Sequence, residues 1–194
     1  MWGSWNQWGD PRTELEHATE LGQKALALDD GNISALTLLA ESDWMHLRFD
    51  QAVADAERAV DINPNYAQGY QALADVLLIY GKPEAALRAA QKAIRLDPTG
   101  KDLYSINVGG AYIEMGRYED AVPILKQSLT TCPNIMVGYL FLINAYVHLG
   151  RDEDARAEAA EVMRMSPQFT LASVPRTRDP DWNKLFWMIC ARQG

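Results

Sequence analysis

The amino-acid sequence predicts an all-α protein built as a stack of helix pairs: four full repeats, an N-terminal half repeat and a C-terminal capping helix. Three observations support this fold class: regularly spaced helix-ending prolines, rows of small residues in register with them, and a glycine before the second helix of most pairs. A single helix pair cannot bury its apolar face, so pairs of this kind are stable only when they stack on their neighbours.

The helix ends repeat at a nearly constant step along the chain. Four prolines recur with a period of about 34 residues, at Pro64, Pro98, Pro133 and Pro167. Proline ends a helix because it has no N–H to donate and its ring clashes with the preceding turn. The phrase Leu28-Asp29-Asp30 lies one period earlier, with the proline replaced by Asp30. Five predicted helix ends therefore share one period.

Small residues recur where paired helices must cross. Twelve residues before each helix end stands an alanine, in the row Ala18, Ala52, Ala86, Ala121 and Ala155. Seven residues later the row is Ala25, Ala59, Ala93, Ser128 and the larger Val162. Side chains of this size let two helix backbones approach closely. Both rows therefore predict helix pairs that pack in the same way in every repeat.

A sharp turn is expected within each pair. Gly81, Gly116 and Gly150 stand seventeen residues before their helix ends, and glycine adopts a positive φ at little cost. Leu47 occupies this position in the first full repeat and departs from the rule. Acidic residues follow the later turns, as in Glu119-Asp120, and they favour the N-terminus of the next helix.

These positions resemble the tetratricopeptide repeat, whose signature is Trp-x-x-Leu-Gly-x-x-Tyr, then Ala-x-x-x-Phe, then Pro, within one period. The third repeat keeps Val108, Gly109, Tyr112, Ala121 and Pro133, and the fourth keeps Tyr139, Leu142, Tyr146, Ala155 and Pro167. The resemblance implies a right-handed α-α superhelix in a single domain, 1–194, with repeats at 33–66, 67–100, 101–135 and 136–169. Residues 1–32 then form a cap and half repeat, and 179–193 a capping helix.

Both ends carry further signals. Asp10-Pro11 is typical of a helix start, and residues 11–29 are expected to form the second helix of the half repeat. Trp2, Trp5 and Trp8 are expected to cover the open end, the alternative being an aromatic peptide-binding box. At the other end Asp179-Pro180 opens a helix with an apolar stripe formed by Trp182, Leu185, Phe186 and Ile189.

Short segments point to a particular kind of array. Glu20 to Asp30, Ser166 to Leu171 and Arg176 to Pro180 are similar to tetratricopeptide arrays that follow bacterial class III adenylate/guanylate cyclase domains or transcription-regulator domains. This resemblance implies a bacterial protein. The first eight residues lack the positive start and apolar core of a secretion signal, so we expect a cytoplasmic protein. The sequence has no cyclase catalytic segment, so the resemblance carries no such activity.

The family resemblance places the first helix of each repeat on the concave face. Counting along these helices gives the candidate partner-binding residues Thr37, Glu41, Trp44, Gln68, Gln71, Asp75, Ile106, Asn107, Leu140, Phe141, Asn144 and His148. Family members that clamp a C-terminal carboxylate use Lys and Arg here, and this face has neither. We expect an amphipathic, basic protein or peptide partner, held by Glu41 and Asp75. Alternatively, the apolar members pack between helices or lie under the chain's own tail.

Other chemistries are not expected. The net charge of −8 and the lack of a basic cluster disfavour nucleic acid, and no apolar run approaches the roughly 20 residues that a membrane span needs. His17, His46 and His148 have no metal-ligand spacing, the two cysteines are far apart, and no nucleophile and base are brought together. We therefore predict no enzyme, no cofactor and no metal.

The leading hypothesis is an adaptor or scaffold in the cytoplasm. Two alternatives stay open: a self-assembling structural module, such as a homodimer formed through the end caps, and a regulatory domain acting in cis within a larger signalling protein, of which this chain is an excerpt.

Overall fold

The computed structural model describes residues 11–167 and 169, and the regular secondary structure of this part of the chain is all helical. Its elements are α1 (Pro11–Leu28), α2 (Ile33–Met45), α3 (Phe49–Ile62), α4 (Ala67–Ile79), α5 (Pro83–Leu96), a 3-10 turn (Pro98–Gly100), α6 (Lys101–Glu114), α7 (Tyr118–Thr131), α8 (Met136–His148) and α9 (Asp152–Met165). The all-α prediction is confirmed. The expected end cap at Trp2, Trp5 and Trp8 and the expected helix at 179–193 lie outside the described residues.

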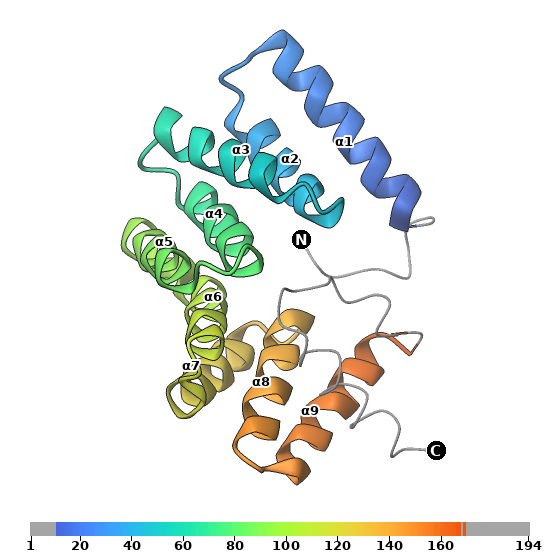
Figure 1. The fold of residues 1–194 in the computed structure, drawn as a ribbon, viewed down its shortest axis with the longest axis vertical. Coiled ribbons are helices and arrows are strands. Elements are labelled where there is room, and N and C mark those ends of the chain that lie inside the picture. Colours follow the sequence, from blue (N-terminus) through green and yellow to red (C-terminus); the bar gives the residue numbers. More distant parts are fainter. Residues whose placement is uncertain (1–10, 168, 170–194) are drawn as a thin grey trace.

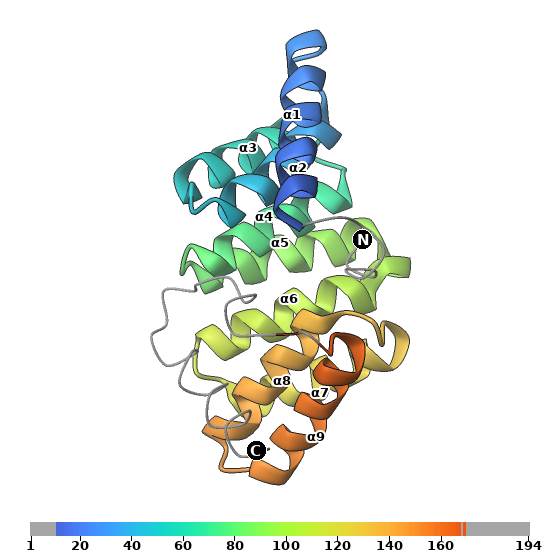
Figure 2. The ribbon, with the colours of Figure 1, turned by 90° about the vertical axis from the view of Figure 1, so that its right-hand side faces the viewer.

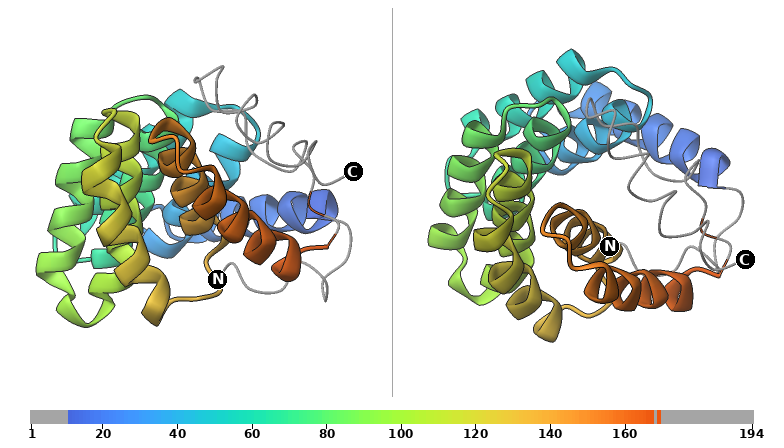
Figure 3. Two further views of the ribbon diagram at one scale, coloured as in Figure 1. Left: turned by 90° about the horizontal axis from the view of Figure 1, so that it is seen from below. Right: turned by 60° about the horizontal axis from the view of Figure 1, so that its bottom comes forward.

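The helices stack in pairs that curve into a superhelix (Figure 1). Successive first helices, α2, α4, α6 and α8, pack directly on one another. The second helices, α3, α5, α7 and α9, make no such contact with each other in the described part of the chain. Viewed from the side, the pairs follow one another along the long axis (Figure 2), and viewed from below the stack curls around an opening (Figure 3). The first helices therefore form one continuous surface.

The two small-residue rows lie at the helix crossings, as expected. Ala52, Ala86, Ala121 and Ala155 are fully or almost fully buried, and so are Ala59, Ala93, Ser128 and Val162. A larger side chain in either row would push the two backbones apart. Ala18 and Ala25 are only half-buried, since α1 stands at the end of the described stack.

Each turn between paired helices has the same hydrogen-bonded form. After α4, the N–H of Lys82 donates to the carbonyl of Leu77, and the N–H of Gly81 donates to the carbonyl of Leu78. This double closure is the Schellman motif, which needs a positive φ at its central residue. Gly81, Gly116 and Gly150 have φ of 79°, 71° and 68°. Leu47 adopts the same conformation, at φ 62°, after α2.

Glycine allows one especially close helix contact. A Cβ added to Gly109 of α6 would collide with the Leu125 side chain of α7, which is completely buried and cannot move aside. Gly109 therefore lies inside a helix and serves packing.

Candidate functional site: the concave face

One position of the first helices forms a row across all four repeats. Glu41 of α2, Asp75 of α4, Gly110 of α6 and Asn144 of α8 follow one another at the repeat period and share this position. The axes of packed helices lie about 8–10 Å apart, so each step along the row is of that order. Two carboxylates therefore occupy one half of the row, and a glycine and an amide occupy the other half.

The two carboxylates influence each other. Asp75 is half-buried, and desolvation raises its pKa to about 7, with the negative charge of Glu41 adding to the effect. The Glu41 side chain reaches solvent, and desolvation raises its pKa as well. Desolvation therefore disfavours the charged form of each carboxyl, and at Asp75 the negative charge of Glu41 adds to that cost. A cation placed between them would relieve that cost.

Asn107 links two adjacent repeats beneath this pair. Its side-chain amide, buried in α6, donates a hydrogen bond of 3.3 Å to the backbone carbonyl of Gln71 in α4. Its interaction with the Asp75 carboxyl partly offsets the rise in that residue's pKa. Asn107 therefore fixes α6 against α4 and helps to hold the Asp75 carboxyl in position.

The other half of the row is packed differently. A Cβ at Gly110 would lie 2.7 Å from Cε2 of Phe141 and 3.1 Å from Cδ1 of Leu78, so these two side chains fill the space that the glycine leaves. Phe141 contacts both large apolar clusters of the core. This half of the face is therefore apolar and closely packed.

Asn144 is the exception within the packed half. Its side chain is buried, with 3% exposed, and its Oδ1 has no hydrogen-bond partner in the described structure. A buried amide oxygen without a donor costs about 1–3 kcal/mol. An incoming N–H group would recover this energy, so Asn144 is a candidate hydrogen-bond acceptor for a ligand.

The remaining candidates are separated by burial. Trp44, Ile106 and Leu140 are 4%, 2% and 7% exposed and pack in the core, because their side chains turn toward neighbouring helices. This burial favours the alternative that these apolar members pack between helices. Thr37 is half-buried and donates to the carbonyl of Ser34 in its own helix, at 3.0 Å.

Gln68 is exposed at the start of α4, and Gln71 is half-buried in the same helix. His148, at the end of α8, stacks on the Tyr118 ring with the ring centroids 4.3 Å apart. This contact holds His148 against α7, away from the carboxylate pair.

Gly110 was missing from the sequence-derived candidates, although it shares the register position of Glu41, Asp75 and Asn144. The step from Asp75 to Gly110 is one residue longer than its neighbours, and following the longer third repeat would have identified the glycine. A glycine offers no functional group, so only the neighbours that fill its space show its role.

The described residues offer neither a metal site nor a membrane span. No group of three or more His, Cys, Asp or Glu side chains there is arranged to hold a metal ion. No helix in the same part is both long and apolar enough to cross a bilayer. The register positions of the concave face that were used above contain neither Lys nor Arg in α2, α4, α6 or α8.

Paired helices stacked at one constant period define an α-helical repeat protein of the solenoid class. Family models for the tetratricopeptide repeat match residues 37–101 and 104–135, together half of the chain. The chain belongs to the tetratricopeptide repeat family.

Curated relatives match over short stretches. The chain is 45% identical over 49 residues to small glutamine-rich tetratricopeptide repeat-containing protein 2 of Saccharomyces cerevisiae, which is 25% of this chain and 14% of that protein. It is 32% identical over 83 residues to the STIP1 homolog of Dictyostelium discoideum, 43% of this chain and 14% of that one. The Hsp70-Hsp90 organizing protein of Triticum aestivum is 38% identical over 56 residues, 29% of this chain and 10% of that protein. The chain thus spans about a seventh or less of these relatives.

Solved structures share the superhelical fold. A thermophilic tetratricopeptide repeat protein of Thermus thermophilus superposes with a TM-score of 0.71 at 22% identity, over 91% of each chain. PilW, a type IV pilus biogenesis factor, gives a TM-score of 0.70 at 22% identity, over 94% of this chain and 80% of that one. YrrB, described as having an unusual peptide-binding site, gives 0.54 at 20% identity, over 82% of both chains. At these identities the likeness establishes the fold.

Proposed function

We propose that this protein is an interaction adaptor whose concave face binds a segment of another protein, with a Lys or Arg of that segment placed between Glu41 and Asp75. The observation that carries the proposal is the pair of carboxylates one repeat apart, both with raised pKa, on a face whose register positions offer no cation. A basic side chain would supply the missing charge, and charge-assisted hydrogen bonds of this kind are strong.

The packed half of the face supports a second contact. Asn144 would accept a hydrogen bond from an N–H of the segment, and Phe141 would provide apolar surface beside it. Asp75 and Asn144 are two repeats apart, or about 16–20 Å. An extended peptide covers that distance with about five or six residues. The expected ligand therefore has a basic residue about five or six positions from the N–H that meets Asn144.

The absence of Lys and Arg from these positions also bears on the kind of ligand. A C-terminal carboxylate would meet two carboxylates there, which repel it. The Hsp70-Hsp90 organizing protein and the peptide-binding protein YrrB are similar to this chain and support a role in protein interaction. The proposed ligand is an internal basic and apolar segment.

The test begins with a peptide selected from a random phage-displayed library on the intact protein. We expect Lys or Arg to be enriched in the selected sequences. Glu41→Lys with Asp75→Lys should then weaken the selected peptide by about 1–3 kcal/mol in a calorimetric titration. The milder Glu41→Gln with Asp75→Asn should weaken it in the same direction while removing only the negative charges.

Glu57→Lys with Asp61→Lys is the matched control, since it changes the net charge equally at two exposed positions of α3. This control should leave the affinity nearly unchanged. If the Glu57/Asp61 control lost as much affinity as Glu41→Lys with Asp75→Lys, the effect would come from net charge alone. Unchanged affinity in the Glu41/Asp75 variants would exclude the concave face as the binding site.

A further inference from the structure

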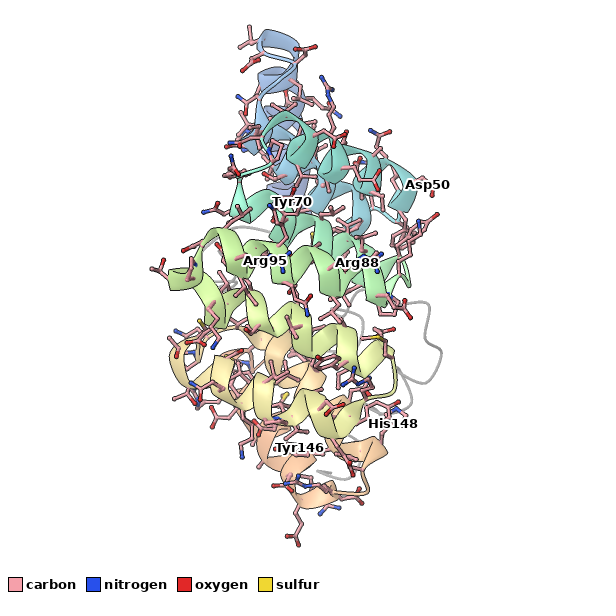
Figure 4. The ribbon with its side chains drawn as sticks, turned by 90° about the vertical axis from the view of Figure 1, so that its left-hand side faces the viewer. Asp50, Tyr70, Arg88, Arg95, Tyr146 and His148 are labelled. Atoms are coloured by element: carbon pink, nitrogen blue, oxygen red, sulfur yellow. The ribbon has the colours of Figure 1, made fainter. Side chains whose placement is uncertain are left out.

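A stripe of cations runs along the outer face of α5. Arg88, Lys92 and Arg95 are spaced four and then three residues apart, which places them on one side of the helix over about 10 Å. Arg88 and Arg95 are exposed and Lys92 is half-buried. Figure 4 shows Arg88 and Arg95 on α5 and Tyr70 nearby, on the side of the molecule where α5 is in view.

These cations lack carboxylate partners within the described structure. There, ion pairs are made by Lys24, Arg48, Arg58, Arg117, Arg151 and Arg164. Lys92 lies over the Tyr70 ring, with Nζ 5.8 Å from the ring centroid, and Arg88 and Arg95 form no ion pair with any described residue. In a chain of net charge −8, three neighbouring cations without a carboxylate favour an anionic partner.

The outer face of α5 is not covered by its neighbours. Within the described residues the backbone of α5 lies close to α4, α6 and the 3-10 turn, and it does not approach the backbone of α3 or α7 in the same way. The buried side of α5 is an alanine surface, formed by Ala86, Ala89, Ala90 and Ala93, so the helix is held firmly from behind. The stripe is therefore displayed on a rigid support.

We propose that this stripe, Arg88, Lys92 and Arg95, is a second binding surface that takes an acidic helical segment of a partner protein. Carboxylates spaced four and three residues apart on the partner helix would match the stripe, and the two guanidinium groups can each hold a carboxylate through two hydrogen bonds. The half-buried Tyr70 ring adds apolar contact at the edge. This surface is separate from the carboxylate row of α2 and α4.

The chemistry favours a narrow acidic segment over a nucleic acid or a membrane. Three cations along about 10 Å neutralise few phosphates of a nucleic acid. In addition, the exposed Glu57 and Asp61 of the preceding outer helix, α3, would repel an extended anionic surface. Asp61 precedes Arg95 by one repeat, so acidic and basic side chains occupy equivalent places in adjacent repeats.

Two fluorescein-labelled, alanine-based helical peptides of equal charge would test this surface with the full chain. One carries its glutamates on a single face with spacings of four and three residues, and the other distributes them around the helix. Fluorescence anisotropy should show the single-face peptide binding several-fold more tightly. Arg88→Glu with Arg95→Glu should weaken that peptide about tenfold or more, and Arg88→Gln with Arg95→Gln should weaken it to a smaller extent.

Lys126→Glu with Arg156→Glu is the matched control, since it makes the same charge change at exposed cations of α7 and α9. It should change the affinity less than about twofold. Circular dichroism melting would establish whether every variant folds. If the double glutamate variant does not fold, the double glutamine variant is used for the test. Equal binding of the two peptides, or an equal loss in the control, would overturn the proposal.

Additional binding measurements would detect other occupants of this surface. Tighter binding to phosphatidylserine vesicles or to duplex DNA than to the single-face peptide would overturn the assignment to an acidic segment. Light scattering that shows dimers dissociated by Arg88→Glu with Arg95→Glu would make a second copy of the chain the occupant, which also contradicts it.

Discussion

The two halves of the concave face are built from the same kind of helix but differ in chemistry. On α2 and α4 the shared register position holds Glu41 and Asp75, whose charges are costly in place. On α6 and α8 the same position holds Gly110 and Asn144, and Phe141 fills the space beside the glycine. The repeat thus fixes where a side chain lies, while one residue per repeat decides whether the surface is charged or packed.

The halves also differ in their turns. Leu47, in the first full repeat, takes the left-handed conformation that glycine takes at the three later turns. Its turn is reinforced by Arg48, whose Nε and Nη2 donate to Oδ1 of the buried Asp43 at 3.0 and 2.5 Å. The N-terminal half thus contains both the costly charges and the strained turn, and the C-terminal half contains the tightest packing.

The largest expected effect tests the packing of the C-terminal half. Gly109→Ala should lower the free energy of unfolding by about 2–3 kcal/mol, because the new Cβ collides with the buried Leu125 and this outweighs the better helix propensity of alanine. Urea denaturation gives the value.

Gly69→Ala is the matched control in the N-terminal half. Its Cβ would lie 3.0 Å from Cδ1 of the half-buried Tyr66, whose ring can shift. We expect a change of less than about 1 kcal/mol. Similar losses at Gly69 and Gly109 would show that the two halves are packed alike.

The next effect tests the charge cost at Asp75. Well below its ordinary pKa of 3.8 the carboxyl is protonated in both folded and unfolded chains, and it costs nothing. As the pH rises toward the folded pKa of about 7, the unfolded chain ionises first and the folded state loses relative stability. The asparagine in Asp75→Asn cannot ionise. The free energy of unfolding of this variant should therefore exceed that of the wild type by about 2 kcal/mol at pH 8, and the difference should shrink toward pH 4.

Urea midpoints measured at pH 4 and pH 8 would check this difference. Asp61→Asn, at an exposed position of α3, is the control and should show a small difference at both pH values. A stability difference for Asp75→Asn that does not change with pH would mean that burial and the Glu41 charge do not govern this carboxyl.

The smallest effect tests the turns. Leu47→Gly should stabilise the protein by about 1 kcal/mol, because glycine has no Cβ to strain at φ 62°. The reverse change, Gly81→Leu, should destabilise it by about the same amount, since a Cβ there meets no neighbour and only backbone strain acts. Thermal melting of both variants would check the pair, and a destabilised Leu47→Gly would show that the leucine side chain contributes more than its strain costs.

Much of the site could be read from the register alone. The period placed Glu41, Asp75, Asn107 and Asn144 on the first helices, and the groove positions counted along those helices hold neither Lys nor Arg. Register counting alone did not decide between groove and core for Trp44, Ile106 and Leu140, which are buried. The position of a residue along a helix specifies the direction of its side chain only to within part of a helical turn. A large apolar side chain then takes the rotamer that buries more of its surface.

The sequence by itself determined the helices, their pairing and their turns, because proline, glycine and the alanine rows act locally and recur at one period. Only the tertiary structure decided that Phe141 occupies the space beside Gly110, that the oxygen of Asn144 is left without a donor, and that desolvation, together with the Glu41 charge, raises the pKa of Asp75. These outcomes depend on distances between residues a repeat or more apart, and those distances are set when the helix pairs stack.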